Sequence, residues 1–282
     1  MPELPEVETI ARDLCSAGLV GRVLACGRVY WDRSVAEPAP AAFCRRVGGK
    51  QVAAVRRRGK YLVFDFADGE GLLIHLRMSG RLHLVPAAQE RLLHEHVVLA
   101  FTDGSELRLH DTRKFGRVYL LRDVERLLGR LGPEPLEPDF TLQRFVSMLR
   151  SRNRHIKPLL LDQTFMAGLG NIYTDEALWE ARIHPLRRSR GIAADEARAL
   201  HRAIRVVLKR GLTNLGTSLG TGKANFYSVG RRRGRNSDRL KVFRRTGNPC
   251  PRCGTAIARI VVGQRSTHVC PRCQVLQKAH RE

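Results

Sequence analysis

The chain has 282 residues, and its 50 Lys and Arg against 27 Asp and Glu give a formal net charge of +23. This length allows one large domain or two ordinary ones, each with a real hydrophobic core. No apolar run reaches the roughly eighteen residues of a membrane-spanning helix, and no signal-peptide pattern stands at the start, so we expect a soluble, intracellular protein. The positive excess indicates a polyanionic partner. Nucleic acid is the commonest one, and an anionic membrane surface is the alternative.

The first ten residues, MPELPEVETI, predict a helix that begins almost at the terminus. Two prolines stiffen this stretch, whereas the ends of most domains are frayed and polar. Apolar residues then recur at the spacing of one helical face: Val7, Ile10, Ala11 and Leu14. An amphipathic helix at this place would tie the N-terminus to a core. The sequence therefore predicts that the α-amine is held in a fixed position.

Residues 19–121 are predicted to form β-structure. Short β-rich runs occupy residues 61–66, 72–76, 97–101 and 118–121. Turn signals separate these runs at Asp68-Gly69, Ser79-Gly80 and Asp103-Gly104. Several short strands at this spacing are typical of a β-sandwich.

Residues 131–140, LGPEPLEPDF, carry three prolines and three acids and predict an interdomain linker. Beyond it, residues 141–182 are predicted to be helical, interrupted at 167–171 by a turn with two glycines. Residues 194–210 predict a further helix, with acids in its first turn, bases in its last and Gly211 as its cap.

A glycine-rich, basic segment follows. Residues 223–245 hold nine Lys or Arg and one Asp, which is too polar for a core. We expect the Arg231–Arg235 run to face solvent or phosphate, because so many arginines cannot be buried without partners.

Four of the seven cysteines form two matched Cys-x-x-Cys knuckles with sixteen residues between them: Cys250, Cys253, Cys270 and Cys273. This spacing is typical of a four-thiolate tetrahedral zinc site. Redox dithiols and a pair of disulfides are the alternatives, and a reducing compartment disfavours disulfides. We expect one structural Zn²⁺ per chain.

The predicted fold class is therefore α+β. It comprises an N-terminal helix and β-sandwich domain at residues 1–130, a linker at 131–140, a helical domain with a basic loop at 141–240 and a zinc module at 241–282.

An α-amine that is held in a fixed position can act as a nucleophile near neutral pH. Its pKa is about 7.7–8.0, against about 10.4 for a lysine amine, so far more of it is neutral and nucleophilic near neutral pH. If Met1 is removed, Pro2 supplies a secondary amine, whose attack on a sugar C1′ gives an iminium directly. Glu3 beside it is suited to protonating the sugar oxygen. The alternative is that Pro2 and Glu3 merely start a helix.

The motifs of the chain resemble those of formamidopyrimidine-DNA glycosylases over its whole length. They are MPELPEVETIARDL, RRRGKYL, HLRMSGRL, DTRKFGRV, LGPEPL, AGLGNIYTDEALWEARIHP and CPRCGTAI with QRSTHVCPRCQ. The sister endonuclease VIII branch usually has Gly where this chain has Leu4, and lacks the Glu-Thr that follows Val7. The resemblance implies a helix–two-turn–helix domain and a β-hairpin zinc finger behind the catalytic domain. It also implies a bifunctional DNA glycosylase and AP lyase of base excision repair for oxidised purines such as 8-oxoguanine and formamidopyrimidines, cutting the strand by β,δ-elimination.

The resemblance assigns catalytic roles to five positions. Pro2 matches the proline that attacks C1′ and forms the Schiff base, and Glu3 matches its acid partner. Glu6 matches a carboxylate that holds the terminus. Lys60 matches a lysine credited with β-elimination and phosphate contact. Arg265 matches an arginine that grips phosphate and assists δ-elimination.

Seven further positions match DNA contacts. Three match the residues that fill the space left by a flipped nucleotide: Met78, Arg113 and Phe115. Among them, the Arg113 guanidinium would face the orphaned base. Four match phosphate contacts: His94, Arg152, Lys157 and Asn171, the last in the turn of the helix–two-turn–helix.

Three departures from the family pattern bear on specificity. Arg77 replaces a glycine, Thr112 replaces a proline, and FYSVGRRRGRNSDRL replaces a shorter, less basic segment after the loop that caps the base. Catalysis and fold should therefore carry over, whereas substrate preference does not.

Alternatives stay open at this point. An endonuclease VIII-like preference for oxidised pyrimidines and a non-catalytic lesion-binding relative are two of them. A basic zinc-ribbon RNA binder would explain the charge and the cysteines but not the N-terminus. We expect a monomer acting on double-stranded DNA with oxidised bases, without membrane contact, in a bacterial cytoplasm at the nucleoid.

Overall fold

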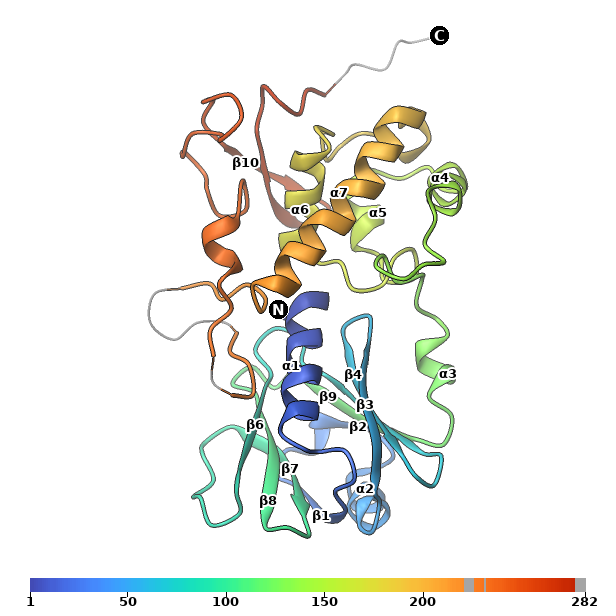
Figure 1. The fold of residues 1–282 in the computed structure, drawn as a ribbon, viewed down its shortest axis with the longest axis vertical. Coiled ribbons are helices and arrows are strands. Elements are labelled where there is room, and N and C mark those ends of the chain that lie inside the picture. The colour runs from blue at the N-terminus through green and yellow to red at the C-terminus, as the bar shows by residue number, and fades with distance from the viewer. Residues whose placement is uncertain (221–225, 231, 277–282) are drawn as a thin grey trace. The chain divides into compact units, whose positions relative to one another are not determined.

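The computed structural model describes residues 1–220, 226–230 and 232–276, which form two compact units (Figure 1). The first unit contains residues 1–130 and 211–237, and the second contains residues 131–210 and the chain from 238 onward. The segment after residue 210 thus returns to the unit that holds the N-terminus. None of the helices in the described ranges is both long and apolar enough to cross a membrane.

The first unit is a β-sandwich with one hydrophobic core between two sheets. One sheet has the strand order β2 (Val35–Glu37), β9 (Arg117–Leu121), β5 (Gly71–His75), β4 (Tyr61–Phe66) and β3 (Val52–Arg58). The other has the order β1 (Leu24–Val29), β7 (Glu95–Phe101), β8 (Ser105–His110) and β6 (Arg81–Pro86). Neighbours pair antiparallel except β2 and β9, which are parallel. The predicted sandwich is confirmed.

Helix α1 (Leu4–Ser16) covers this core from the start of the chain and packs on β3 and β4 (Figure 1). Glu3 and Glu6 form a capping box at its first turn, which satisfies backbone amides that the helix itself leaves open. The side chains that the period predicted, from Val7 to Leu14, are buried. The predicted helix therefore begins one residue after Glu3, and the terminus is held as expected.

Part of the region 19–121, which was predicted to be β-structure, is helical. Residues Pro40–Val47 form helix α2, whose Phe43 and Val47 are fully buried one helical turn apart. Proline at the first helical position favours this start. Two shorter helical elements, η1 (Asp32–Ser34) and α3 (Glu125–Leu128), complete the first 130 residues.

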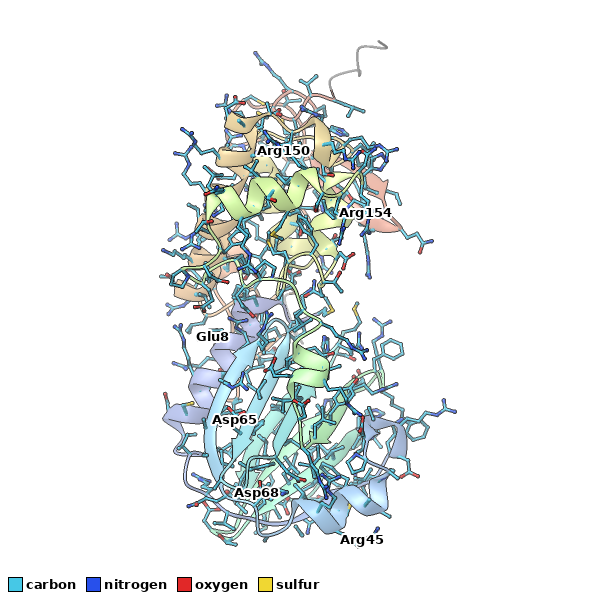
Figure 2. All side chains as sticks on the ribbon, turned by 90° about the vertical axis from the view of Figure 1, so that its right-hand side faces the viewer. Glu8, Arg45, Asp65, Asp68, Arg150 and Arg154 are labelled. Carbon is cyan, nitrogen blue, oxygen red and sulfur yellow. The ribbon has the colours of Figure 1, made fainter. Side chains whose placement is uncertain are left out.

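The second unit is helical and ends in a hairpin. Its helical elements are α4 (Leu142–Arg150), α5 (Ile156–Leu161), α6 (Asn171–Glu180), η2 (Ser189–Gly191) and most of α7 (Ala194–Thr213). The short helix η3 (Asn236–Arg239) lies where the chain passes from the first unit into the second, and the hairpin consists of β10 (Ala258–Val262) and β11 (Arg265–Val269). The glycine-containing turn before α6 was predicted, but the break between α4 and α5 was not. Both units carry exposed arginines, such as Arg45 on the first and Arg150 and Arg154 on the second (Figure 2).

Gly211 is not the cap of α7, contrary to the sequence prediction. The helix continues to Thr213, and the chain turns where Leu215 and Gly216 adopt positive φ angles of 58° and 81°. The Gly216 N–H donates to the Gly211 carbonyl at 2.8 Å and so closes the last turn. The helix therefore ends before Leu215 and Gly216, the residues with left-handed backbone, and not at Gly211.

Candidate active site

The N-terminus of α1 is fixed by one buried carboxylate. Glu6 is 1% exposed, and its Oε2 accepts the Glu3 N–H at 2.8 Å. Its Oε1 accepts the N–H of Thr217, more than two hundred residues along the chain, at 2.7 Å. A Cβ at Gly216 would lie 2.9 Å from the Glu6 side chain, so this position requires glycine. Pro2 and Glu3, which precede the helix, are both buried.

Lys60 lies in the turn between β3 and β4 and is 6% exposed. The nearby His75 closes β5, and burial together with the charges of Arg77 and Lys60 lowers the pKa of its imidazole to about 3. The His75 Nδ1 accepts the Arg77 N–H at 3.0 Å. His75 is therefore a neutral acceptor at physiological pH, and it adds no positive charge beside the lysine.

Two large apolar side chains stand exposed on loops of the sandwich. Met78 is 38% exposed, and Phe115 is 45% exposed with the Arg113 guanidinium 4.9 Å from its ring centre. Exposed apolar side chains on a charged protein mark a contact surface when they cluster on loops. Both belong to the three residues that were expected to fill a vacated nucleotide position.

Asp111, which sequence reasoning missed, ties these loops together. Its carboxylate is 1% exposed and accepts the Ser79 hydroxyl next to Met78. It also accepts the Gly116 N–H at 2.6 Å and the Arg113 N–H at 3.2 Å. An aspartate directly before a turn that ends in glycine is a recognisable signal, because such side chains bond to the backbone a few residues on.

Three residues near these loops adopt positive φ without being glycine: Arg77 at 52°, His94 at 72° and Lys114 at 59°. This conformation is strained for residues with a Cβ and is concentrated at functional sites. The left-handed backbone at Arg77 accounts for the glycine usual at this position in the family, and nothing in the structure explains why arginine stands here instead.

In the second unit, Lys157 is not placed to contact a phosphate as the resemblance implied. Its ammonium is 0% exposed and donates to Asp175 Oδ1 at 2.6 Å, Thr267 Oγ1 at 2.8 Å and the Ser266 carbonyl at 3.1 Å. No sequence pattern indicates this partner set, because Thr267 is more than a hundred residues away. Lys157 joins helices α5 and α6 to the start of β11.

The neighbouring side chains extend this junction. Asn171, the first residue of α6, donates its Nδ2 to the Ser266 carbonyl at 2.9 Å. Asp175 Oδ2 accepts the His268 N–H at 2.9 Å. Arg265, the first residue of β11, directly precedes Ser266 and is exposed. Arg152, which follows α4, is exposed as well. The hairpin that carries Arg265 is thus attached to α6 by buried polar groups.

Glu176 provides a further attachment that the sequence did not reveal. Its buried carboxylate accepts the backbone N–H groups of Lys241, Val242 and Phe243 at 2.8–3.0 Å. Burial raises the pKa of this carboxyl, although the three amide donors oppose the rise. Two consecutive acids of α6, Asp175 and Glu176, therefore hold the C-terminal module.

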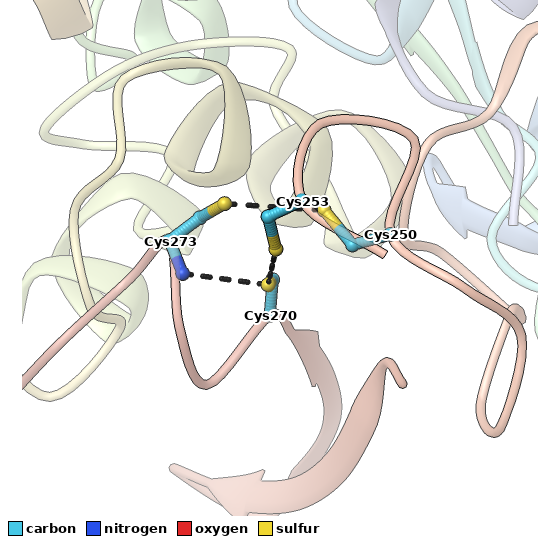
Figure 3. Close-up of side chains that lie close together, drawn as sticks. All are labelled: Cys250, Cys253, Cys270 and Cys273. Carbon is cyan, nitrogen blue, oxygen red and sulfur yellow. Dashed lines mark hydrogen bonds between the residues drawn. The ribbon is translucent and has the colours of Figure 1, made fainter. Parts of the chain in front are cut away.

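The four predicted metal ligands meet at one point (Figure 3). The sulfurs of Cys250, Cys253, Cys270 and Cys273 all lie within 4.8 Å of one another. Cys253 and Cys270 are separated by 3.5 Å between sulfurs, and Cys250 and Cys273 by 3.9 Å. Zinc–sulfur bonds of about 2.3 Å in a tetrahedron place sulfurs about 3.8 Å apart, whereas a disulfide needs about 2.05 Å. The donor set fits one closed zinc site, without a coordination position for substrate.

Three family models match the chain along its length. The formamidopyrimidine-DNA glycosylase N-terminal domain matches residues 1–118, and the formamidopyrimidine-DNA glycosylase H2TH domain matches residues 131–222. The zinc finger found in FPG and IleRS matches residues 247–275.

Full-length relatives agree. The chain is 45% identical to the formamidopyrimidine-DNA glycosylase of Protochlamydia amoebophila, over 97% of this chain and 99% of that protein. It is 47% identical to that of Herpetosiphon aurantiacus, over 97% and 100%. Among solved structures, a mutant of the Lactococcus lactis FPG in complex with Fapy-dG containing DNA aligns with a TM-score of 0.89 at 36% identity, covering 98% of this chain and 100% of that one. The MutM (FPG) protein of Thermus thermophilus aligns with a TM-score of 0.87 at 37% identity, covering 97% and 98%.

The chain therefore belongs to the formamidopyrimidine-DNA glycosylase family. The family predicted from the motifs, its α+β fold and its structural zinc site are confirmed.

His75 generates a prediction about pH. In the unfolded chain its pKa is about 6.5, and the folded value is about 3, so below pH 6.5 the unfolded state binds one more proton. This group makes stability fall as pH decreases from 6.5 toward 3, by about 1.4 kcal/mol per pH unit. Urea unfolding between pH 6 and 4 should show a shallower pH dependence, by about that amount, for His75→Asn, which keeps an acceptor for Arg77. Equal slopes for the two proteins would contradict the assignment.

The Lys157–Asp175 pair generates a second prediction. Lys157→Met leaves a buried carboxylate without its cation, which should lower the free energy of unfolding by about 3–5 kcal/mol. Arg202→Met, at an exposed arginine on α7, is the control and should change it by at most about 0.5 kcal/mol. Chemical unfolding of the zinc-loaded proteins measures both values. A loss below about 1 kcal/mol for Lys157→Met would show that the pair does not hold the hairpin.

Proposed function

We propose that this chain is a bifunctional DNA glycosylase and AP lyase that removes oxidised purines from double-stranded DNA through a Schiff base on Pro2. The observation that carries the proposal is the buried start of α1, where Glu6 holds the Glu3 amide beside Pro2. Relatives of known structure bind DNA that contains Fapy-dG, carbocyclic 8-oxo-G or an abasic site, which supports the same substrate class.

The proposed reaction begins with the Pro2 nitrogen. It attacks C1′ of the damaged nucleotide, the bond from C1′ to the base breaks, and the departing base takes a proton. The proton that the attacking amine loses goes to the departing base. Glu3 protonates the sugar ring oxygen as the bond from C1′ to that oxygen breaks, which opens the ring and leaves an iminium between C1′ and the Pro2 nitrogen. The resulting iminium acidifies the C2′ hydrogen, whose loss expels the 3′ phosphate. Lys60 assists this β-elimination, and Arg265 assists the δ-elimination that expels the 5′ phosphate.

The fixed amine makes this chemistry efficient. Glu6 accepts two backbone N–H groups, and hydrogen bonds to a charged acceptor are worth about 1.5–3 kcal/mol each. The nucleophile is thus positioned before the substrate arrives, and its orientation requires no ordering during the reaction. The zinc ion, held by the four cysteines, supplies a rigid cross-link for the hairpin that carries Arg265.

The proposed DNA contacts fall into two groups. Met78, Arg113 and Phe115 fill the space of the flipped nucleotide, and Asp111 keeps their loops in register. His94, Arg152 and Asn171 contact phosphates. Lys157 is not included, because its ammonium is enclosed by protein acceptors.

The expected setting of this activity also belongs to the proposal. All the proposed catalytic groups come from one chain, which supports action as a monomer. Genomic DNA as substrate supports a place in the bacterial cytoplasm at the nucleoid. An endonuclease VIII-like preference for oxidised pyrimidines is the alternative, and a panel of defined lesion duplexes separates the two.

The first prediction from this mechanism concerns covalent trapping. Incubation with an 8-oxoguanine duplex and borohydride should give a stable protein–DNA adduct, and peptide mapping should place the cross-link at residue 2. A variant with one extra residue before Pro2 should give no adduct, because its α-amine is displaced. An adduct at Lys60 instead, or none with any oxidised base, would refute the mechanism.

The second prediction concerns the base opposite the lesion. Arg113→Ala should lose about 1–3 kcal/mol of discrimination between cytosine and adenine opposite 8-oxoguanine, because a guanidinium donates to the acceptors of cytosine. The ratio of kcat/KM on the two duplexes measures it. Arg122→Ala, at an arginine that is 88% exposed on the same unit, is the control and should keep the wild-type ratio. A wild-type ratio in Arg113→Ala would exclude this role.

A further inference from the structure

The segment that departs from the family pattern folds against helix α1. The Asp13 side chain, near the end of α1, is 9% exposed and forms an ion pair with Arg232. Its Oδ2 also accepts the Gly230 N–H at 3.4 Å. We call this set of contacts, Asp13 with Gly230 and Arg232, the α1 clasp.

An apolar anchor accompanies the clasp. Phe226 is 2% exposed and belongs to the same hydrophobic core as Val7, Ile10 and Leu14 of α1. Val229 packs partly buried against that core. The Arg81 guanidinium of β6 lies 5.2 Å from the centre of the Tyr227 ring. Phe226 and Val229 are therefore part of the first unit's packing, whereas Gly230 and Arg232 of the clasp itself are exposed.

Hydrogen bonds connect the clasp to the chain that follows α7. The Ser228 N–H donates to the Arg232 carbonyl at 2.9 Å, and the Ser218 hydroxyl donates to the Phe226 carbonyl at 2.6 Å. The Ser218 Oγ in turn accepts the Gly234 N–H at 2.9 Å. The two sides of the segment are thus joined to each other.

The same segment reaches the catalytic end of α1. Asn236 donates its Nδ2 to Thr217 Oγ1 at 2.9 Å and its N–H to the Gly216 carbonyl at 3.0 Å. A Cβ at Gly234 would lie 2.3 Å from that carbonyl, so the backbones are in close contact. The Thr217 N–H is the group that Glu6 accepts. Both ends of α1, at Asp13 and at Glu6, therefore hold one continuous network.

We propose that the α1 clasp is a positioning element for the reaction of Pro2. The pair of Asp13 and Arg232 holds the segment against α1, which keeps the Thr217 amide on Glu6 and, through Glu6, the N-terminal amine in place. This rests on the proposed function. Arg232 then acts within the protein as the partner of Asp13, while most of its side chain faces solvent, as was expected for the run.

The described arginine that follows Arg232 has a different partner. Arg233 donates to the Gly220 carbonyl, and Arg231 lies outside the described residues. Because Arg232 is 59% exposed, its ion pair is of the kind that contributes modestly. The expected effect of losing it is a reduced rate rather than an inactive enzyme.

The experiment compares Arg232→Ser and Asp13→Asn with wild type in single-turnover reactions. Each variant should form the borohydride-trapped adduct about two- to fivefold more slowly, the size expected for one exposed pair. The effect should be the same on an 8-oxoguanine duplex and on a preformed abasic duplex, because both need the amine. The double variant should be no slower than either single one, and Arg232→Lys should recover most of the rate. Additive losses in the double variant would overturn the proposal.

A second measurement tests the structural effect of the α1 clasp independently of catalysis. Amide hydrogen exchange at Thr217, followed by mass spectrometry of the free protein, should be faster in Arg232→Ser than in wild type. Glu8→Gln is the matched control on the same helix, where Glu8 pairs with Arg12 and Arg57, and it should leave exchange at Thr217 unchanged. This readout tests the clasp even if wild type forms no adduct, in which case only the proposed function fails.

Salt dependence tests the competing role for Arg232. If it contacts a phosphate, Arg232→Ser should flatten the slope of log affinity against log salt by about 0.9 for damaged and undamaged duplex alike. The clasp predicts an unchanged slope. A flattened slope with unchanged exchange at Thr217 would assign Arg232 to the DNA backbone and overturn the proposal.

Discussion

The carboxylate of Glu6 is the constraint on which the first unit depends. It is almost completely buried, so its charge must be satisfied by protein donors, among them the amides of Glu3 and Thr217. One amide starts the first helix and the other follows α7. Removing either donor would leave a buried charge poorly solvated, which is far more costly than losing a surface contact. The path of the chain after residue 210 is therefore tied to the position of its first residues, and the glycine at 216 permits that approach.

The second unit contains a buried cation, the Lys157 ammonium, whose charge must also be satisfied by protein groups. Lys157 is enclosed by Asp175, Thr267 and a backbone carbonyl, and Asp175 is shared with His268. Such a pair adds little net stability compared with apolar packing, but the loss of one member is strongly destabilising. It therefore specifies a single orientation of the hairpin. The zinc site rigidifies the hairpin from one end and the buried pair attaches it to α6, so Arg265 is carried by a structure that is fixed at both places.

The sequence predicted what depends on local pattern and missed what depends on distant partners. The start of α1, the strands of the sandwich and the four zinc ligands followed from period, turn residues and spacing. Helix α2 was missed because its eight residues are too few to show a clear period. The enclosure of Lys157 and the pairing of Arg232 could not be found, because their partners lie far away in sequence and become neighbours only when the chain is folded. Motif matching placed Lys157 at a DNA contact because a motif records the residue type and not the direction of its side chain.

Acidic and basic side chains are buried to different extents in this protein. Eight acids are buried among the described residues, against three Lys or Arg side chains, Lys60, Arg108 and Lys157. The acids are Glu3, Glu6, Glu95, Glu106, Asp111, Glu134, Asp175 and Glu176. Several of them accept backbone amides, which arginine and lysine cannot do because they have no acceptor. Acids therefore serve as internal cross-links, whereas most of the described Lys and Arg side chains lie outside the core, at the surface. The same division that holds the N-terminal amine in place thus leaves the excess of positive charge at the surface, where it attracts a polyanion.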